Sequence, residues 1–236
     1  MYQKLKNSYE NTENRKELID ASSKEQFKNY IQKLKTQLEL NLPGEQAQLK
    51  MAPPDRPRQD TDQSTRNAGV LILLYPFEND IYTVLIQRPE YNGAHSGQIS
   101  LPGGKFEFDK DISLVDTAFR ETHEEIGVNR KEIHFVGQLT RLFIPVSNNL
   151  VQPFIGCLSY KPTFVPDPRE VDEIYPIRLS DLLDPQCILK DEIILSNRKS
   201  IIAPFYKVNS LQVWGATAMI LSEFFEIHKN LMATLR

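Results

Sequence analysis

QISLPGGKFEFDKDISLVDTAFRETHEEIGV, residues 98–128, is the stretch that decides the fold. Its second half predicts one helix, because Ser113 with Asp116 three residues later gives a capping-box start and Gly127 gives a stop. At about 100° per residue, a mostly apolar stripe lies opposite three carboxylates. The stripe is Val115, Ala118, Phe119, Thr122 and Ile126, and the carboxylates are Glu121, Glu124 and Glu125. One side of this helix is suited to packing and the other to chemistry.

The three carboxylates predict a metal site. At ~4 Å and an effective dielectric of ~20, each like-charge pair costs roughly 4 kcal/mol. A helical pair between Arg120 and Glu124 returns only about 0.2 to 0.5 kcal/mol. A divalent cation removes the imbalance, and an all-oxygen ligand set suits Mg²⁺ or Mn²⁺ better than Zn²⁺. We therefore expect Mg²⁺ or Mn²⁺ to be bound by Glu121, Glu124 and Glu125.

A solvated helix face is the alternative for three neighbouring glutamates. The segment before the helix favours a site, because the pair Gly103-Gly104 lets the backbone approach a ligand closely and then turn into the helix. An acidic loop follows the glycines and contains Glu107, Asp109 and Asp111. His123 lies well away from the mean carboxylate direction on this helix, so we expect a surface histidine and not a ligand.

Loop, turn and helix together resemble the Nudix box, the signature of the Nudix hydrolases. Residues 120–128 match the family pattern Arg-Glu-x-x-Glu-Glu-x-Gly-Val at every fixed position. The first half departs from it, because Lys110 stands where a glutamate is usual and the spacing from Gly104 to Arg120 is longer. The extended loop is similar to the variant found in the coenzyme A pyrophosphatase branch of the family.

A second stretch, before the glycine pair, also resembles that branch. Leu85-Ile86-Gln87-Arg88 and His95-x-Gly97-Gln98 are similar to its substrate signature. The wording Trp-Gly-x-Thr-Ala at 214–218 also resembles the branch, but we expect the helix that follows it to serve core packing. The match is partial, because Gly93 stands where an arginine is usual. Loss of an arginine that could meet a phosphate leaves other nucleotide substrates open.

The resemblance implies roles for particular residues. Arg120 would orient a carboxylate, and either Glu124 or Glu170 would be the general base. Glu170 begins a segment that is similar to the one that completes the metal site in many Nudix proteins. The implied catalytic residues are Arg120, Glu121, Glu124 and Glu170, and the implied substrate-binding residues are Arg88, Gly97, Gly103, Gly104 and Lys105.

The implied reaction is metal-dependent cleavage of the diphosphate of coenzyme A or acyl-coenzyme A to 3′,5′-ADP and (acyl-)4′-phosphopantetheine. An alternative is a Nudix hydrolase of another nucleoside diphosphate derivative, such as ADP-ribose, NADH or a dinucleotide. A further alternative is a Nudix module that senses a nucleotide without cleaving it. Such a module would be expected to lack one of the helix carboxylates, and all of them are present here.

Composition excludes several other classes of protein. With 236 residues, 40% hydrophobic and 25% charged, the chain is typical of a soluble globular protein, and a net charge of -3 disfavours nucleic-acid binding. The longest apolar run, Ala68–Tyr75, is far shorter than the ~20 residues of a membrane helix, and the polar start is unlike a signal peptide. We expect a cytoplasmic protein that does not bind membranes, with Cys157 and Cys187 reduced and partly buried.

The expected fold class is α/β, a Nudix-type α/β/α sandwich with a mixed sheet and an N-terminal helical extension. Residues 1–22 are predicted to be a weakly ordered arm, 23–65 a helix and an extended linker, and 66–236 the Nudix hydrolase domain. The helix, from Ser23 to the Pro43-Gly44 stop, has an apolar stripe that docks either on the catalytic domain or on the second subunit of a homodimer. Strands are expected near 68–74, 82–87, 98–101, 133–142, 151–160 and 170–176, with helices at 179–183 and 219–227.

Overall fold

The computed structural model describes residues 21–54, 56, 61–91, 95–194 and 200–233. Within them a mixed sheet of 8 strands forms the centre, in which β1 and β7 are parallel and the other pairings are antiparallel. Its strands are β1 Arg66–Phe77, β2 Asp80–Gln87, β3 Ile99–Ser100, β4 Gly103–Lys105, β5 His134–Gln138, β6 Leu142–Ile144, β7 Asn149–Cys157 and β8 Glu173–Arg178. The predicted mixed sheet is confirmed.

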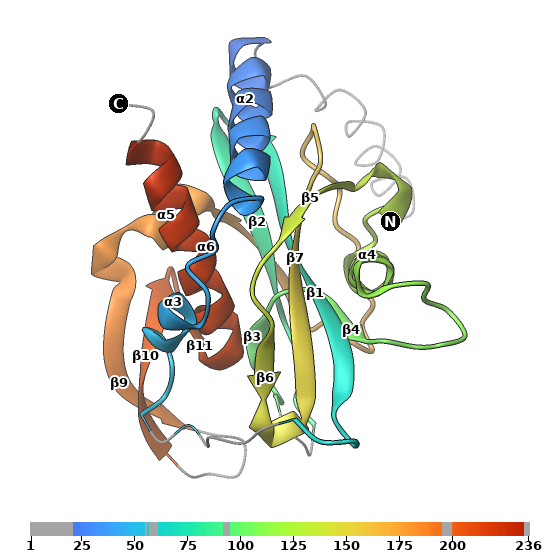
Figure 1. Ribbon diagram of the computed structural model, residues 1–236, viewed down its shortest axis with the longest axis vertical. Helices are drawn as coiled ribbons and strands as arrows, with labels where there is room; N and C mark the ends of the chain where they lie inside the picture. Colours follow the sequence, from blue (N-terminus) through green and yellow to red (C-terminus); the bar gives the residue numbers. More distant parts are fainter. Residues whose placement is uncertain (1–20, 55, 57–60, 92–94, 195–199, 234–236) are drawn as a thin grey trace, which may run out of the picture.

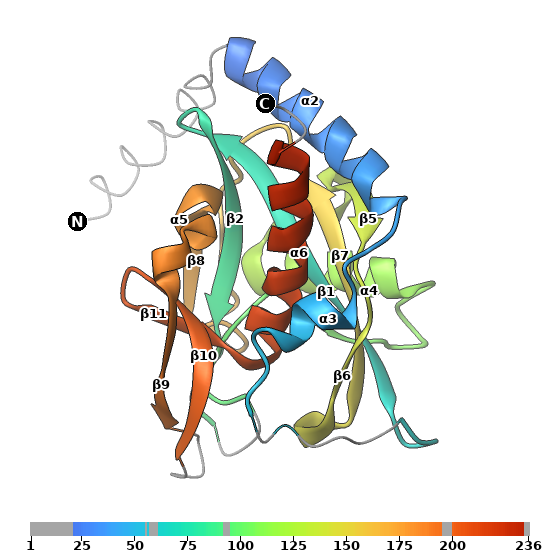
Figure 2. The same ribbon diagram turned by 60° about the vertical axis from the view of Figure 1, so that its left-hand side comes forward.

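Helices cover both faces of this sheet (Figures 1 and 2). The helix α4, Leu114–Ile126, lies on one face, and α6, Gly215–Ala233, lies on the other with α2, Ala21–Leu38. Side chains alternate along β1 in agreement with this arrangement: Leu71, Leu73 and Tyr75 join the core under α4, while Ile72 and Leu74 join the core under α6. The expected α/β/α sandwich with an N-terminal helical extension is therefore confirmed.

Most predicted strands exist with somewhat different bounds. The strands β1 and β2 form a hairpin in which Tyr75 pairs with Tyr82. The segment predicted as one strand over 133–142 is divided into β5 and β6, because the chain turns at Thr140 to bind Glu223 of α6. The predicted glycine turn is instead the short strand β4, in which Gly104 pairs with Gly69 of β1.

The N-terminal segment packs on the same chain. Its apolar stripe is buried against α6 and the edge strand β5, and the hydroxyl of Tyr30 hydrogen-bonds Nδ1 of His228 at 2.8 Å. A second short helix, α3 Glu45–Leu49, was not predicted. Docking on the catalytic domain is confirmed, the homodimer stays a prediction, and the predicted arm lies outside the described residues except for its last two residues, which belong to α2.

A second sheet of 3 strands, which the sequence patterns did not indicate, follows β8 and the predicted helix α5, Leu179–Leu183. It consists of β9 Ile188–Ile194, β10 Ser200–Val208 and β11 Leu211–Trp214. The available signal was the pair Asn209-Ser210 between two apolar runs, since Asn209 has a φ of 54°, as tight hairpin turns require. The helix α6 then begins at Gly215, earlier than predicted, and most of its apolar side chains are buried in the core.

Cys157 and Cys187 are not joined to each other and are both buried, more completely than the partial burial that was expected; their reduced state stays a prediction. Among the described helices, none combines the length and the apolar character that a bilayer span needs.

A buried glutamate on α6 connects the N-terminal segment to the catalytic domain. The Glu223 carboxylate has 0% exposure and accepts hydrogen bonds from Gly44 N at 3.2 Å, Gln48 Nε2 at 2.8 Å and Thr140 Oγ1 at 2.7 Å. These donors belong to two separate chain segments, α3 with its N-cap Gly44 and the β5–β6 connection at Thr140. Their partner therefore fixes α3 and the β5–β6 connection relative to α6.

We expect Glu223→Ala to lower the free energy of unfolding by about 3 kcal/mol, because several buried or half-buried donors lose their common acceptor. Urea unfolding measures the change. The control is Glu226→Ala on the same helix, whose half-exposed pair with Lys50 should contribute less than about 1 kcal/mol. Equal losses in the two variants would contradict the assigned role of Glu223.

Candidate active site

The predicted ends of α4 are confirmed. Ser113 Oγ accepts a hydrogen bond from Asp116 N at 3.3 Å, and Gly127 adopts the left-handed conformation, with a φ of 74°. The apolar stripe of the helix is buried or half-buried, and His123 is exposed as expected. Local sequence signals therefore place the helix and fix which residues share a face.

The structure brings together three carboxylates that can hold a metal ion. Oxygens of Glu121, Glu125 and Glu170 lie within 4.8 Å of one another. The first two project from α4 and are buried, whereas Glu170 is exposed in the turn before β8. Glu170 thus precedes the strand that it was expected to begin, because β8 starts only at Glu173.

Glu124, the third predicted helix ligand, lies outside this group. Its carboxylate is 41% exposed and accepts a hydrogen bond from Arg120 Nη1 at 2.8 Å. The assignment of Glu124 to the metal stays a prediction.

Two glycines let the strand β4 lie close to the carboxylates of Glu121 and Glu125. A Cβ at Gly104 would lie 2.4 Å from Oε1 of Glu121, and a Cβ at Gly103 would lie 2.4 Å from the carbonyl oxygen of Gly69. Gly103 also has a φ of +147° and donates its N–H to Oε2 of Glu125 at 2.8 Å. A side chain at Gly104 would collide with Glu121 of α4, and one at Gly103 would collide with Gly69 and Val70 of β1. The glycine pair therefore lets β4 lie close to both β1 and the helix carboxylates.

Arg120 is the buried centre of an ionic network behind the carboxylates. Its Nε and Nη2 donate to the two oxygens of Asp111 at 2.7 and 2.9 Å, and Nη1 lies 2.9 Å from Glu121. Hydrogen bonding to Arg120 lowers the pKa of Asp111 to about 2. The guanidinium orients carboxylates, and it is not among the side chains that line the cleft described below, which agrees with the role that the resemblance implied.

The electrostatics fit a divalent cation. Burial raises the pKa of Glu125 to about 8, although Arg88, 3.7 Å away, and the N–H of Gly103 act in the opposite direction. Burial also raises the pKa of Glu121. Two buried carboxylates whose negative charge is so poorly compensated are suited to a hard cation, which would supply the missing positive charge to oxygen ligands.

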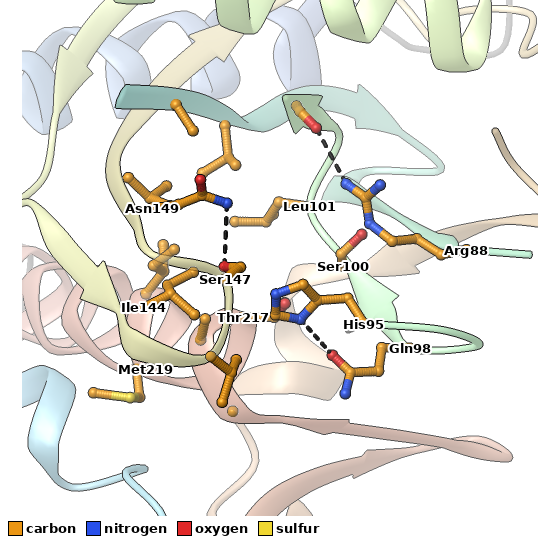
Figure 3. Close-up of a pocket in the computed structure, with 18 of the residues that line it drawn as sticks. Arg88, His95, Gln98, Ser100, Leu101, Ile144, Ser147, Asn149, Thr217 and Met219 are labelled. Atoms are coloured by element: carbon orange, nitrogen blue, oxygen red, sulfur yellow. Dashed lines mark hydrogen bonds between the residues drawn. The ribbon is translucent and has the colours of Figure 1, made fainter. Parts of the chain in front are cut away.

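A cleft of about 1350 Å³ opens beside the carboxylates and continues to the second sheet. Figure 3 shows Arg88, Ser100 and Leu101 on one side of this pocket and Ile144, Ser147 and Met219 on the other. Trp214, Thr217 and Met219 reach the cleft from β11 and α6. A volume of this size accommodates a ligand larger than a simple nucleotide.

The structure places the predicted substrate-binding residues unequally. Arg88, Gly103, Gly104 and Lys105 line the cleft, and Arg88 donates to the carbonyl oxygen of Gly103 at 3.2 Å. Gly97 does not line it, but has a φ of +66° in the loop that leads to β3. Gly93, where the branch usually has an arginine, lies outside the described residues. Sequence reasoning missed other lining residues, among them Arg56 and Arg66. His95, Trp214 and Thr217 also line the cleft, and their only sequence signal was that they lie in stretches that resemble the coenzyme A pyrophosphatase branch.

Comparison with known proteins agrees with this site. The NUDIX domain family matches residues 65–194. The chain is 34% identical over 165 residues to the mitochondrial Nudix hydrolase 15 of Arabidopsis thaliana, with 66% of this chain and 56% of that protein covered. It is 31% identical over 153 residues to the human mitochondrial coenzyme A diphosphatase NUDT8, with 64% and 61% covered. The chain belongs to the Nudix family.

A third relative is the peroxisomal coenzyme A diphosphatase ndx-8 of Caenorhabditis elegans, which is 33% identical over 165 residues with 67% of each chain covered. The match spans 56% and 61% of the lengths of the Arabidopsis and human proteins. The family match ends at residue 194. It therefore includes the three carboxylates and β1–β9, but not the wall of the cleft formed by β10, β11 and α6.

We expect Glu170→Gln to raise the half-saturating Mg²⁺ concentration at least about tenfold, because one oxygen ligand of the group loses its charge. Glu124→Gln is the matched variant, and it should lower turnover if Glu124 also serves the metal. Titration of activity with Mg²⁺ and with Mn²⁺ compares the two variants. Unchanged metal affinity in Glu170→Gln would remove Glu170 from the site, and wild-type behaviour of Glu124→Gln would remove Glu124.

Proposed function

We propose that the chain is a divalent-metal-dependent pyrophosphohydrolase that cleaves the diphosphate of coenzyme A or acyl-coenzyme A. The products would be 3′,5′-ADP and (acyl-)4′-phosphopantetheine. The observation that carries the proposal is the group of Glu121, Glu125 and Glu170 at the edge of a cleft of about 1350 Å³. The three side chains would hold Mg²⁺ or Mn²⁺, which when bound screens the diphosphate and makes water a better nucleophile.

The other residues of the site have roles that follow from their positions. Arg88 lines the cleft 3.7 Å from Glu125, where its guanidinium can bind a phosphate oxygen of the substrate. Lys105 adds a second positive charge on the same strand as the glycine pair. Glu170, unlike Glu124, lines the cleft, so we assign it the role of the base that accepts a proton from the attacking water.

The preference for coenzyme A draws on relatives and on the shape of the cleft. The human NUDT8 and the worm ndx-8 are named coenzyme A diphosphatases, and each is more than 30% identical to this chain. Apolar side chains from β10, β11 and α6, among them Ile201, Trp214 and Met219, line the cleft. An apolar wall of this kind suits a pantetheine or acyl chain.

Other nucleoside diphosphate substrates are the competing proposal. They keep the same metal chemistry and change the leaving group to ADP-ribose, NADH or a dinucleotide. The replacement of an arginine by Gly93 is the observation in their favour.

Product analysis of coenzyme A, ADP-ribose and NADH, each with Mg²⁺, Mn²⁺ or chelator, tests the proposal. We expect release of 3′,5′-ADP from coenzyme A at the highest rate, and no release with chelator. Faster cleavage of ADP-ribose or NADH would contradict coenzyme A as the preferred substrate, but it would leave the proposed role of the metal intact. Absence of metal-dependent turnover on all three would leave the nucleotide-sensing module as the explanation.

Two further expectations from the sequence stay proposals. We propose a cytoplasmic location, which cell fractionation tests; the names of several relatives place those proteins in mitochondria or peroxisomes. We also propose a homodimer, although the apolar stripe of α2 is already occupied by contacts within the chain. Light scattering of the full chain measures the oligomeric state.

A further inference from the structure

Two arginines that precede the family signature lie at the end of the cleft formed by β6 and the turn Pro145–Ser147. Arg56 donates to the carbonyl oxygen of Phe143 and lies 2.9 Å from the sulfur of Met219. Arg66 donates to the carbonyl oxygen of Ser147 at 2.8 Å. Both guanidinium groups are therefore attached to the same short segment, residues 143–147.

This end of the cleft is separate from the three carboxylates of Glu121, Glu125 and Glu170. In Figure 3, Ile144, Ser147 and Met219 lie on the opposite side of the pocket from Arg88. Strand geometry explains how Arg66 reaches it, because Arg66, Ala68 and Val70 alternate along β1 and all three line the cleft. Arg56 is positioned by a turn, in which its N–H bonds the carbonyl oxygen of Pro53 at 3.1 Å.

Neither arginine forms an ion pair with a carboxylate in the part of the chain that the structure describes, although the charge of Glu45 acts on Arg56 from beyond ion-pair distance. Among the described residues no carboxylate oxygen lies within 4 Å of Arg56 or Arg66, whereas Arg88 and Arg120 each have at least one. Their hydrogen-bond partners are carbonyl oxygens and a sulfur, and a guanidinium has five N–H donors. Burial lowers the pKa of Arg56, a cost that an anion bound beside it would offset.

We propose that Arg56 and Arg66 form a second phosphate subsite, which binds a phosphate monoester of the substrate while the diphosphate lies beside Glu121, Glu125 and Glu170. The inference rests on the proposed function only for the position of the diphosphate. Guanidinium groups bind phosphate oxygens through two N–H donors at once, and such charge-assisted bonds are stronger than neutral ones. The subsite would select nucleotides that carry a phosphate on the ribose in addition to the diphosphate.

Calorimetric titration of the full chain with adenosine 3′,5′-bisphosphate and with adenosine 5′-monophosphate tests the subsite without turnover. We expect the bisphosphate to bind more tightly than the monophosphate. Arg56→Met should lower the ratio of the two affinities by about tenfold. Arg66→Gln should reduce it less, because Arg66 is exposed. The control Arg178→Gln removes an arginine that pairs with Asp80 and does not line the cleft, so the preference should remain.

Arg56→Lys keeps the charge and covers the case in which Arg56→Met disturbs the linker. It should retain part of the preference, and thermal unfolding reports whether each variant is folded. Equal affinity of the wild type for both ligands, or an unchanged preference in Arg56→Met and Arg66→Gln alike, would overturn the subsite. Failure of the proposed function is seen separately, as absence of metal-dependent cleavage of coenzyme A and of its 3′-dephospho form.

Discussion

Glu125→Gln is expected to lower turnover at least about 10³-fold. The variant loses a charged metal ligand that contributes several kcal/mol to transition-state stabilisation. The same variant should be more stable than the wild type in the absence of metal at alkaline pH. The glutamine oxygen can still accept the hydrogen bond that Gly103 N donates at 2.8 Å. The buried negative charge, however, is gone.

The pH dependence of this effect follows from the pKa of Glu125. Burial raises it from 4.5 to about 8, so between these values the folded state holds a proton that the unfolded state has lost. A raised folded pKa contributes stability that is present below pH 4.5 and is lost as the pH rises through 8. At pH 8.5 we expect metal-free Glu125→Gln to exceed the wild type by about 2 to 5 kcal/mol, or roughly 5 to 15 °C in Tm.

Thermal unfolding with chelator at pH 5.5 and pH 8.5, and again with Mg²⁺, measures this. The metal should stabilise the wild type and have little effect on Glu125→Gln. Glu124→Gln is the control for stability, because it removes an exposed carboxylate from the same helix and should keep the wild-type pH dependence. If metal-free wild type and Glu125→Gln depend on pH in the same way, the carboxyl of Glu125 is not protonated in the folded state.

Arg120→Ala should cost about 3 to 5 kcal/mol of folding stability and abolish measurable turnover. Its removal leaves the buried Asp111 without its main partner and frees Glu121 from its nearest positive charge. The stability and turnover of Arg120→Lys should lie between those of the wild type and Arg120→Ala. A lysine keeps the charge but cannot donate to both oxygens of Asp111 at once. Arg130→Ala is the control, because its exposed contact with Asp116, at 3.8 Å, should contribute less than about 1 kcal/mol.

Acid unfolding separates this ionic role from simple packing. Arg120 lowers the pKa of Asp111 from 3.8 to about 2, so the wild type gains stability above pH 3.8 and loses it as the pH falls through 2. Arg120→Ala lacks this pH-dependent stabilisation by Asp111, so its free energy of unfolding should change less between pH 4 and pH 2. A wild-type acid profile in Arg120→Ala would show that the guanidinium contributes through packing alone.

The catalytic helix could be predicted closely because its signals are local. A serine cap, a glycine stop and a stripe at helical spacing depend only on residues a few positions apart, and the structure has each of them. The strand β1 was equally predictable, since an uninterrupted apolar run requires burial on both faces. The short helix α3 was not, because its place depends on hydrogen bonds to Glu223, far along the chain.

The glutamates of α4 also show which features are local and which depend on tertiary packing. Helix geometry alone put Glu121, Glu124 and Glu125 on one arc, but their directions within the protein depend on how α4 packs on β1. Gly69 sets that packing, because a Cβ there would lie 2.4 Å from the carbonyl oxygen of Leu114. In this arrangement Glu121 and Glu125 face the cleft while Glu124 turns to Arg120.

By itself, the sequence determined the helix with its carboxylates and the glycine pair, since these depend on spacing within short segments. The resemblance that these segments carry implied the family and its mixed sheet. Only the tertiary structure brought Glu170 to the helix carboxylates and placed Arg56 and Arg66 at the other end of the cleft. The reason is physical: spacing along the chain fixes which side chains share a face. The elements that meet across a cleft are selected by the packing of the whole core.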